Sequence, residues 1–259
     1  MNLDLSNRRA LVCGSSGGIG LACAIELAKL GASVTLMARN AEKLAAARAE
    51  LPKGQHDVLV ADLADHAGAE AALRKSLDPA RPYAILINNT GGPPAGAAID
   101  ASAADLLACF QSQLLTAHAL VRTLLDQFKS QKYGRIINIA STSVKQPIPN
   151  LGISNIVRPA VAAWGKCLAT ELGGFGITVN NVLPGYTDTD RLRSLVKGRA
   201  SKQGVDEDKI RQDIMAATPV GRFGTPEEIA SVVAFLASPA AAYVNGINVP
   251  VDGGRLGSL

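Results

Sequence analysis

Aromatic side chains are scarce in this chain, since Phe, Tyr and Trp together make up only 4% of its 259 residues. Alanine is common instead, and 47% of the residues are hydrophobic, a composition that favours helices packed closely on a sheet. No apolar run approaches the roughly 20 residues that span a bilayer. The first residues lack both the basic region and the apolar core of a signal sequence. We therefore expect a soluble, cytoplasmic protein without membrane contacts.

Cysteine, histidine and clustered charge are scarce as well. The four cysteines show neither disulfide nor metal-ligand spacing, so we expect buried, reduced thiols at Cys13, Cys23, Cys109 and Cys167. The three histidines are scattered, which predicts surface or helix positions and no metal site for His56, His66 and His118. The net charge is only +4 at pH 7, and no basic stripe is interleaved with aromatics, so we expect no nucleic-acid partner.

Glycine, by contrast, is concentrated at one position. Four glycines and two serines lie in the turn 14–20, between an expected strand over residues 9–12 and an expected helix over 21–30. Glycine lets the backbone approach a ligand where a Cβ atom would collide. The start of the helix supplies free N–H groups and the positive end of its dipole, which favour a pyrophosphate. The spacing Gly14, Gly18 and Gly20 therefore predicts a dinucleotide site.

Two charged side chains follow the next strands and bear on which nucleotide is bound. Arg39 comes directly after the expected strand 33–38, where an acidic residue would bind a ribose 2′-hydroxyl and an arginine accommodates a 2′-phosphate. This favours NADP(H) over NAD(H); the alternative is that Arg39 caps the strand in solvent. Asp62 follows the expected strand 58–61 and is placed either to contact an adenine edge or to cap the next helix.

Short apolar runs continue to alternate with helical stretches, which predicts a doubly wound α/β fold. Further expected strands cover residues 83–87, 134–140, 177–183 and 247–251, which gives a seven-stranded parallel sheet in a three-layer, Rossmann-like arrangement. Expected helices cover 42–51, 103–130 and 151–172, and another begins at Thr225. Pro159 is expected to separate the first turn of helix 151–172 or to bend it. We expect a single domain over residues 1–259, with a mobile helical lid at 186–218.

In combination these motifs resemble the short-chain dehydrogenase/reductase family, and most of all its 3-oxoacyl-acyl carrier protein reductase-like branch. The resemblance covers essentially the whole chain. The matching residues are the Gly14/Gly18/Gly20 turn, Asp62, Asn88-Asn89-Thr90-Gly91, the run 134–140 with Ser141, Val179-Asn180, Pro184-Gly185 with Thr189, the run 221–230, and Asp252-Gly253-Gly254. The resemblance implies NADP(H) contacts from Gly14, Ser16, Gly18, Ile19, Gly20, Arg39, Asp62, Leu63, Asn89, Thr90, Gly91, Arg158, Pro184, Gly185 and Thr189.

The resemblance breaks at the catalytic residues. The family uses an asparagine, a serine, a tyrosine that protonates the carbonyl oxygen, and a lysine that lowers the phenol pKa and holds the nicotinamide ribose. The matching positions here hold Gln113, Ser141, Ser154 and Arg158, so only the serine is kept. A phenol has a pKa of about 10, whereas an aliphatic hydroxyl is far less acidic and Arg158 keeps its proton. General acid catalysis contributes roughly 10²- to 10⁴-fold, so we expect slow ketone reduction with intact cofactor binding.

Three hypotheses follow. In the first, the protein is an NADP(H)-linked oxidoreductase for a carbonyl or an alcohol, such as a 3-oxoacyl thioester, and another group replaces the tyrosine. Tyr186 is the first choice of proton donor and Lys145 the second; alternatively, Tyr186 packs under the lid. In the second, the protein is a pseudoenzyme that keeps NADP(H) as a structural or sensing ligand. In the third, it assembles with an active relative. Intact cofactor motifs favour the first two.

Two further features concern partners. The long helical stretch 103–130 suits a subunit interface, and the resemblance implies a homotetramer or homodimer. A basic run in the lid either receives the phosphate of an acyl carrier or coenzyme A thioester or forms a solvated helix face. This run consists of Arg191, Arg193, Lys197, Arg199 and Lys202.

Overall fold

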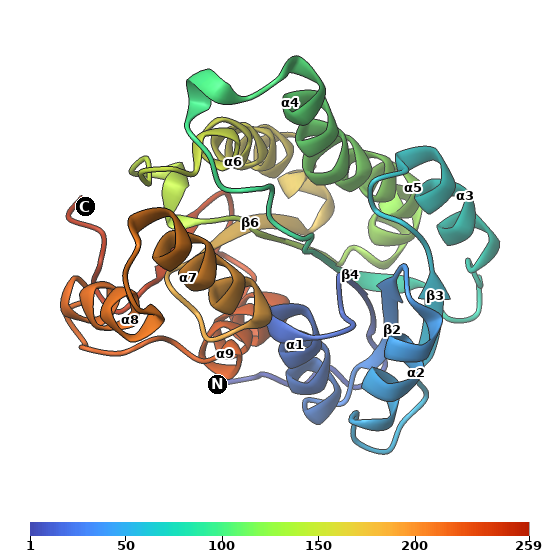
Figure 1. The fold of residues 1–259 in the computed structure, drawn as a ribbon. Helices are drawn as coiled ribbons and strands as arrows, with labels where there is room; N and C mark the ends of the chain where they lie inside the picture. Colours follow the sequence, from blue (N-terminus) through green and yellow to red (C-terminus); the bar gives the residue numbers. More distant parts are fainter. Residues whose placement is uncertain (259) are drawn as a thin grey trace.

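The computed structural model describes residues 1–258 and contains a seven-stranded parallel sheet (Figure 1). The strands are β1 (Arg9–Cys13), β2 (Ser33–Ala38), β3 (Asp57–Val60), β4 (Tyr83–Asn88), β5 (Gly134–Ile139), β6 (Ile177–Pro184) and β7 (Asn248–Val251). Their order in the sheet is β3-β2-β1-β4-β5-β6-β7, so the order of the strands reverses between β1 and β4. The predicted doubly wound, Rossmann-like sheet is confirmed.

Helices cover both faces of the sheet (Figure 1). They are α1 (Gly18–Lys29), α2 (Ala41–Ala49), α3 (His66–Lys75), α4 (Ala103–Phe110), α5 (Thr116–Gln131), α6 (Gly152–Leu172), α7 (Asp190–Gln203), α8 (Glu207–Ala216) and α9 (Pro226–Ala237). The apolar sides of α1, α2 and α9 pack on one face of the sheet, and those of α3, α5 and α6 on the other. Helices α7 and α8, within the expected lid, bury a small apolar cluster of their own.

Side chains at the helix starts explain where several helices begin. The side chains of Asn40 and Asp65 accept hydrogen bonds from the third backbone N–H of α2 and α3. Thr225 and Glu228 form a reciprocal capping box at the start of α9, the helix that the sequence predicts to begin at Thr225. Of the two roles considered for Asp62, capping of the next helix is wrong, because Asp65 caps α3 while the Asp62 carboxylate accepts from the backbone N–H of Ala64, two residues on.

Two long helices differ in detail from expectation. The stretch 103–130 is interrupted by a π-helical segment, Gln111–Leu115, between α4 and α5. A π-helical turn inserts an extra residue, and such turns are frequent at functional sites. In α6 the helix runs unbroken through Pro159, so its first turn is not a separate element.

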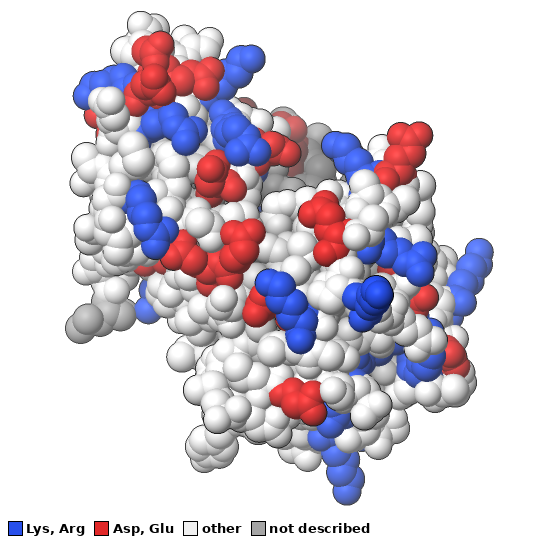
Figure 2. Space-filling view, turned by 90° about the horizontal axis from the view of Figure 1, so that it is seen from below, with Lys and Arg blue, Asp and Glu red and all other residues white. Residues whose placement is uncertain are grey.

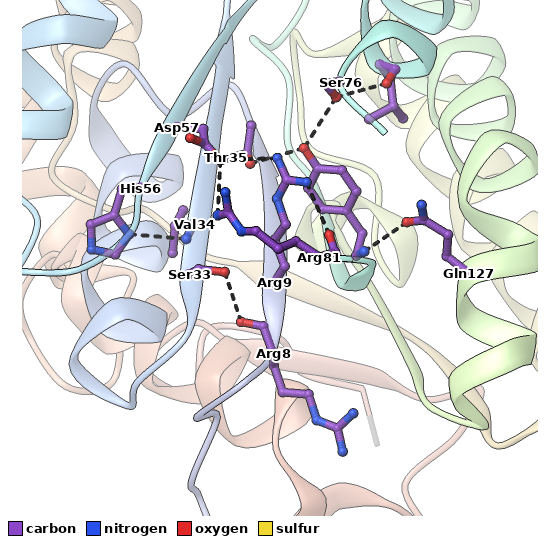
Figure 3. Close-up of polar contacts among 12 residues, drawn as sticks. Arg8, Arg9, Ser33, Val34, Thr35, His56, Asp57, Ser76, Arg81 and Gln127 are labelled. Carbon is purple, nitrogen blue, oxygen red and sulfur yellow. Dashed lines mark hydrogen bonds and ion pairs between the residues drawn. The ribbon is translucent and has the colours of Figure 1, made fainter. Parts of the chain in front are cut away.

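A polar cluster joins residues near the amino ends of β1 to β4 (Figure 3). The glycine turn follows the carboxyl end of β1, so it lies at the opposite ends of these strands. The guanidinium of Arg9 donates to a carboxylate oxygen of Asp57 at 3.1 Å and lies over the ring of Tyr83 at 4.0 Å. The Tyr83 hydroxyl donates to Thr35 at 3.1 Å. These contacts link four neighbouring strands and stabilise the sheet at their amino ends. The carboxyl ends of the same strands take no part in the cluster and are left for ligands.

Two expectations about surface and core are wrong. His56 is buried rather than on the surface, because its Nδ1 accepts from the backbone N–H of Val34 at 3.1 Å and its Nε2 lies 3.0 Å from the carbonyl oxygen of Pro52. Cys167 is exposed on α6, whereas Cys13, Cys23 and Cys109 are buried as expected.

Charges of both signs are mixed over the face that is seen from below Figure 1 (Figure 2). Within residues 1–258 no helix has the length and apolar character needed to cross a membrane. In the same part of the chain, no cluster of three His, Cys, Asp or Glu side chains is arranged to hold a metal ion.

Candidate active site

A cavity of about 400 Å³ opens at the carboxyl ends of the strands, where the order of the sheet reverses. Ligands of open α/β sheets bind at this position. The glycine turn, the segment after β4, the end of β5, helix α6 and the start of α7 all border the cavity. Among the predicted site residues, the lining includes Gly14, Ser16, Gly18, Ile19, Asn89, Thr90, Gly91, Ser141, Ser154, Arg158, Pro184, Gly185, Tyr186 and Thr189.

The glycine turn is packed so closely that side chains cannot be accommodated at two of its positions. Gly14 has φ +58°, and a Cβ atom on it would lie 2.6 Å from the carbonyl oxygen of Asn89. A Cβ atom on Gly20 would lie 2.3 Å from the carbonyl oxygen of Gly14. The Asn89 amide donates to the carbonyls of Cys13 and Gly14 at 3.3 and 3.2 Å. The segment after β4 therefore fixes the turn before α1.

The amino terminus of α1 faces this cavity without a side-chain cap. Its N-cap is Gly17, which makes no side-chain hydrogen bond, and the first turn holds no acidic residue. A Cβ atom on Gly17 or on Gly91 would meet nothing within 4 Å, so both residues present bare backbone to open space. Uncapped N–H groups and a positive helix end fit the diphosphate of a dinucleotide. The residues present therefore fit the predicted cofactor.

Some predicted cofactor residues lie away from the cavity. Gly20 packs behind the turn, and Arg39 is exposed after β2. Asp62 and Leu63 also lie outside the main cavity, although Leu63 borders a smaller one. Lys43, in the first turn of α2, does line the main cavity, and sequence reasoning missed it. The available signal was its place in the first turn of the helix that follows β2 and Arg39.

The opposite end of the cavity holds Ser141, Ser154 and Arg158. Ser154 and Arg158 lie one turn apart on α6, and both are more than nine-tenths buried. The Arg158 guanidinium donates to the carbonyl oxygen of Ile139 at 2.6 Å, which ties it to the end of β5 beside Ser141. Burial lowers the pKa of Arg158 to about 10. Arg158 therefore remains protonated at neutral pH and supplies a fixed positive charge.

Gln113 lies behind this group rather than in the main cavity. It is buried in the π-helical segment, and it lines a small cavity of about 10 Å³ together with Asn88 and Arg158. Its amide oxygen and nitrogen have no hydrogen-bond partner, nor do Asn88 Oδ1 and Arg158 Nε. A polar cavity of this size has room for about one water molecule. The small cavity beside Gln113 therefore has room for a water molecule and has unpaired donors and acceptors around it.

Of the two proposed proton donors, the structure brings one to the cavity. Tyr186 lines it and also packs against the apolar cluster of α7 and α8, so both interpretations of this residue describe part of its surroundings. The guanidinium of Arg255 lies 4.7 Å from the centre of its ring. Lys145 is exposed and does not line the cavity. Arg255 follows β7, and no sequence pattern marked it.

A doubly wound sheet with an uncapped, glycine-lined helix start at its switch point defines a dinucleotide-binding α/β protein. Residues 14–255 match the family model described as enoyl-(acyl carrier protein) reductase. The chain belongs to the short-chain dehydrogenase/reductase family of NAD(P)-dependent oxidoreductases, similar to its 3-oxoacyl-acyl carrier protein reductases.

Three relatives illustrate the range of the similarity. The 3-oxoacyl-[acyl-carrier-protein] reductase FabG of Pseudomonas aeruginosa is 34% identical, over 97% of this chain and 98% of its own. The NADPH-dependent reductase BacG of Bacillus subtilis is 29% identical, over 98% of this chain and 100% of its own. L-sorbose reductase of Gluconobacter frateurii, solved with NADPH and L-sorbose, superposes with a TM-score of 0.93 at 30% identity, with both chains covered completely.

Proposed function

We propose that this protein is an NADP(H)-linked oxidoreductase that reduces a small carbonyl compound or oxidises the corresponding alcohol. One observation carries the proposal: a single cavity joins the uncapped start of α1 to Ser141 and Ser154. The names of the NADPH-dependent relatives support the choice of nucleotide. When bound, the reduced nicotinamide supplies the hydride that adds to the carbonyl carbon.

The cofactor's place in the cavity follows from the residues at each end. We assign its diphosphate to the backbone of Gly14–Gly18 and its 2′-phosphate to Arg39 and Lys43. Thr189 faces this turn from the start of α7, because a Cβ atom on Gly18 would lie 3.5 Å from its methyl group. Thr90 and Gly91 would border the nicotinamide ribose. Asp62 stays assigned to the adenine edge and Leu63 to the cofactor, although neither residue lines the main cavity.

The reacting carbonyl would lie between two hydroxyl groups. Ser141 and Ser154 donate to its oxygen, and the Arg158 charge stabilises the negative charge that develops there. Tyr186 protonates the oxygen, because it is the one phenol that lines the cavity within residues 1–258. A phenol with a pKa of about 10 is a far better donor than a serine hydroxyl.

The test measures binding and turnover separately. NADPH is titrated by fluorescence, and its oxidation is then followed with ketones, aldehydes and acetoacetyl thioesters. The proposal expects binding together with turnover, and a roughly 10²-fold lower turnover in Tyr186→Phe at unchanged NADPH affinity. Tyr243→Phe is the matched control, because Tyr243 is fully exposed and lies outside the cavity. Tight NADPH binding without any turnover would favour the pseudoenzyme hypothesis instead.

We also propose that the chain self-associates as a dimer or tetramer. Large apolar side chains are exposed on α4 and the adjoining π-helical segment, with Leu107 at 69% and Leu115 at 40% relative exposure. Single exposed apolar residues are ordinary, whereas neighbouring ones on a helix favour an interface. Light scattering of the wild type and of Leu107→Lys tests this, and a monomeric wild type would refute it.

A further inference from the structure

Three arginines from separate elements line the cavity, and acidic residues do not balance them. They are Arg158 on α6, Arg191 on α7 and Arg255 after β7. Within residues 1–258 no carboxylate comes within 4.0 Å of these guanidinium groups. Asp190 is the acidic residue in the lining, and its exposed carboxylate pairs with Arg193 at 2.6 Å. This end of the cavity therefore has a net positive charge.

Arg158 makes the imbalance energetically significant. It is 8% exposed, one of its N–H groups is used by Ile139, and its Nε has no partner. Burial is the main cause that lowers its pKa; Cys109 raises the pKa, and the positive charge of Arg191, the smallest of these three effects, lowers it. Buried charges in proteins are normally paired. An anion bound nearby would lower the free-energy cost of burying the Arg158 charge and would offset the repulsion between Arg158 and Arg191.

Arg191 and Arg255 are held at the wall by contacts that leave most of their donors unused. One N–H group of Arg191 donates to the carbonyl oxygen of Pro93, and its Nε lies 3.2 Å from the place of a Cβ atom on Gly92. Arg255 rests on the ring of Tyr186, at 4.7 Å from its centre. A guanidinium has five N–H donors in a planar fork that matches a carboxylate. Both side chains are thus positioned for an anionic group.

We propose that the substrate carries a free carboxylate: an oxoacid in the direction of reduction, or a hydroxyacid in the direction of oxidation. Arg191 and Arg255 bind the carboxylate, and the reacting carbonyl lies beside Ser141 and Ser154. This inference rests on the proposed oxidoreductase function and names its substrate class. A cavity of about 400 Å³ must also hold the nicotinamide end of the cofactor. A small acid therefore fits better than a thioester of a large carrier.

The test compares substrates that share one carbonyl group and differ in charge. Acetoacetate, methyl acetoacetate and acetoacetyl-coenzyme A all carry a 3-oxo group, and levulinate with its methyl ester repeats the comparison at a longer spacing. We expect kcat/KM to be roughly 10²-fold higher for an acid than for its ester, the size of about two charge-assisted hydrogen bonds. In Arg191→Gln and Arg255→Gln the advantage should fall to about tenfold or less, mainly through KM.

Lys197→Gln is the matched control. It removes one positive charge from α7 at an exposed position outside the cavity, so the ratio of acid to ester should stay as in the wild type. Calorimetric titration of acetoacetate and levulinate into the protein–NADP⁺ complex gives a readout that does not depend on turnover. Both arginine variants should weaken this binding at least tenfold and leave NADPH affinity within about twofold.

The outcomes separate this inference from the proposed function. Equal kcat/KM for acid and ester, or a preference for acetoacetyl-coenzyme A, would overturn the proposed carboxylate site. The proposed oxidoreductase function would still stand. Loss of NADPH affinity in Arg191→Gln that matches the loss of acid affinity also overturns it, because that result assigns Arg191 to the cofactor. Binding of both acids without reduction of any compound would refute the proposed oxidoreductase activity but would support the proposed anion site.

Discussion

Arg158 of α6 donates to the carbonyl oxygen of Ile139 at the end of β5, over a distance of 2.6 Å. This bond places a permanent cation where the family resemblance implies a lysine, and it orients α6 so that Ser154, one turn earlier, also lines the cavity. The two replacements are thus coupled through one helix face. The site keeps the positive charge and a hydroxyl but has no phenol at this position.

Restoring both family residues should therefore raise the rate. In Ser154→Tyr with Arg158→Lys, the phenol would enter the cavity and the ammonium would lie one turn away, so we expect roughly 10²-fold faster NADPH oxidation with the ketone panel. Each single variant should give a much smaller rate increase. In Ser154→Tyr alone, for example, the new phenol lies near the Arg158 guanidinium, which cannot pass on a proton. Unchanged rates in the double variant, with NADPH binding intact, would show that the pocket has been rebuilt for other chemistry.

The choice of nucleotide should depend on Arg39 and Lys43. We expect Arg39→Asp to raise the Kd for NADPH by about 10- to 100-fold, or about 1.4 to 2.8 kcal/mol, while the Kd for NADH changes little. The carboxylate repels a 2′-phosphate but accepts a hydrogen bond from a 2′-hydroxyl. Fluorescence titration with both nucleotides measures the ratio. Arg48→Asp makes the same charge change near the end of α2 and outside the cavity, so a similar shift in that variant would contradict a local role.

A row of asparagines crosses four adjacent strands, and two of its members, Asn88 and Asn138, line the smaller cavity. Asn88 donates to Asn138, Asn138 to Asn181 and Asn181 to Asn248, each at 2.8 Å. The paired residues are direct neighbours in the parallel register of β4, β5, β6 and β7. Side-chain amides can form such a row only when every member is present, because each both donates and accepts.

Breaking the middle of this row should destabilise the protein. Asn138→Leu leaves the Asn88 amide N–H and the Asn181 oxygen without partners in the core, and we expect the free energy of unfolding to fall by about 2 to 5 kcal/mol. Asn248→Ala, at the partly exposed end of the row, removes a single bond and should cost about 1 kcal/mol. Urea denaturation measures both, and equal losses would refute the continuous row.

The sequence predicted the sheet well because buried parallel strands are short, continuous apolar runs, as at residues 10–13 in β1 and 83–87 in β4. It also predicted the glycine turn, whose spacing follows from backbone contact with a ligand. The π-helical segment at Gln111–Leu115 was not predicted, because no proline or glycine marks it in the sequence. Arg255 lines the cavity because β7, which precedes it, pairs with β6 in the sheet. No local sequence pattern predicts such a contact.

Local sequence patterns also do not show which side of a buried helix faces outward, and this explains the wrong prediction for Cys167. Helix α6 is apolar on several sides, so periodicity does not show which face lies outward, and Cys167 is exposed. Burial raises the pKa of Cys13 and of Cys23 to about 12 and also raises that of Cys109. Because the thiolate is the reactive form, these three thiols should stay unreactive in the folded protein.

A disulfide exchange reagent should therefore label one of the four thiols quickly at pH 8 and all four after unfolding in guanidinium. Raising the pH from 7 to 9 should not add further fast thiols, because Cys13 and Cys23 remain protonated below their raised pKa of about 12. Cys167→Ser should abolish the fast phase and leave NADPH binding unchanged, because Cys167 does not line the cavity. Two or more fast thiols in the wild type would mean that the helices around the sheet open more readily than their packing implies.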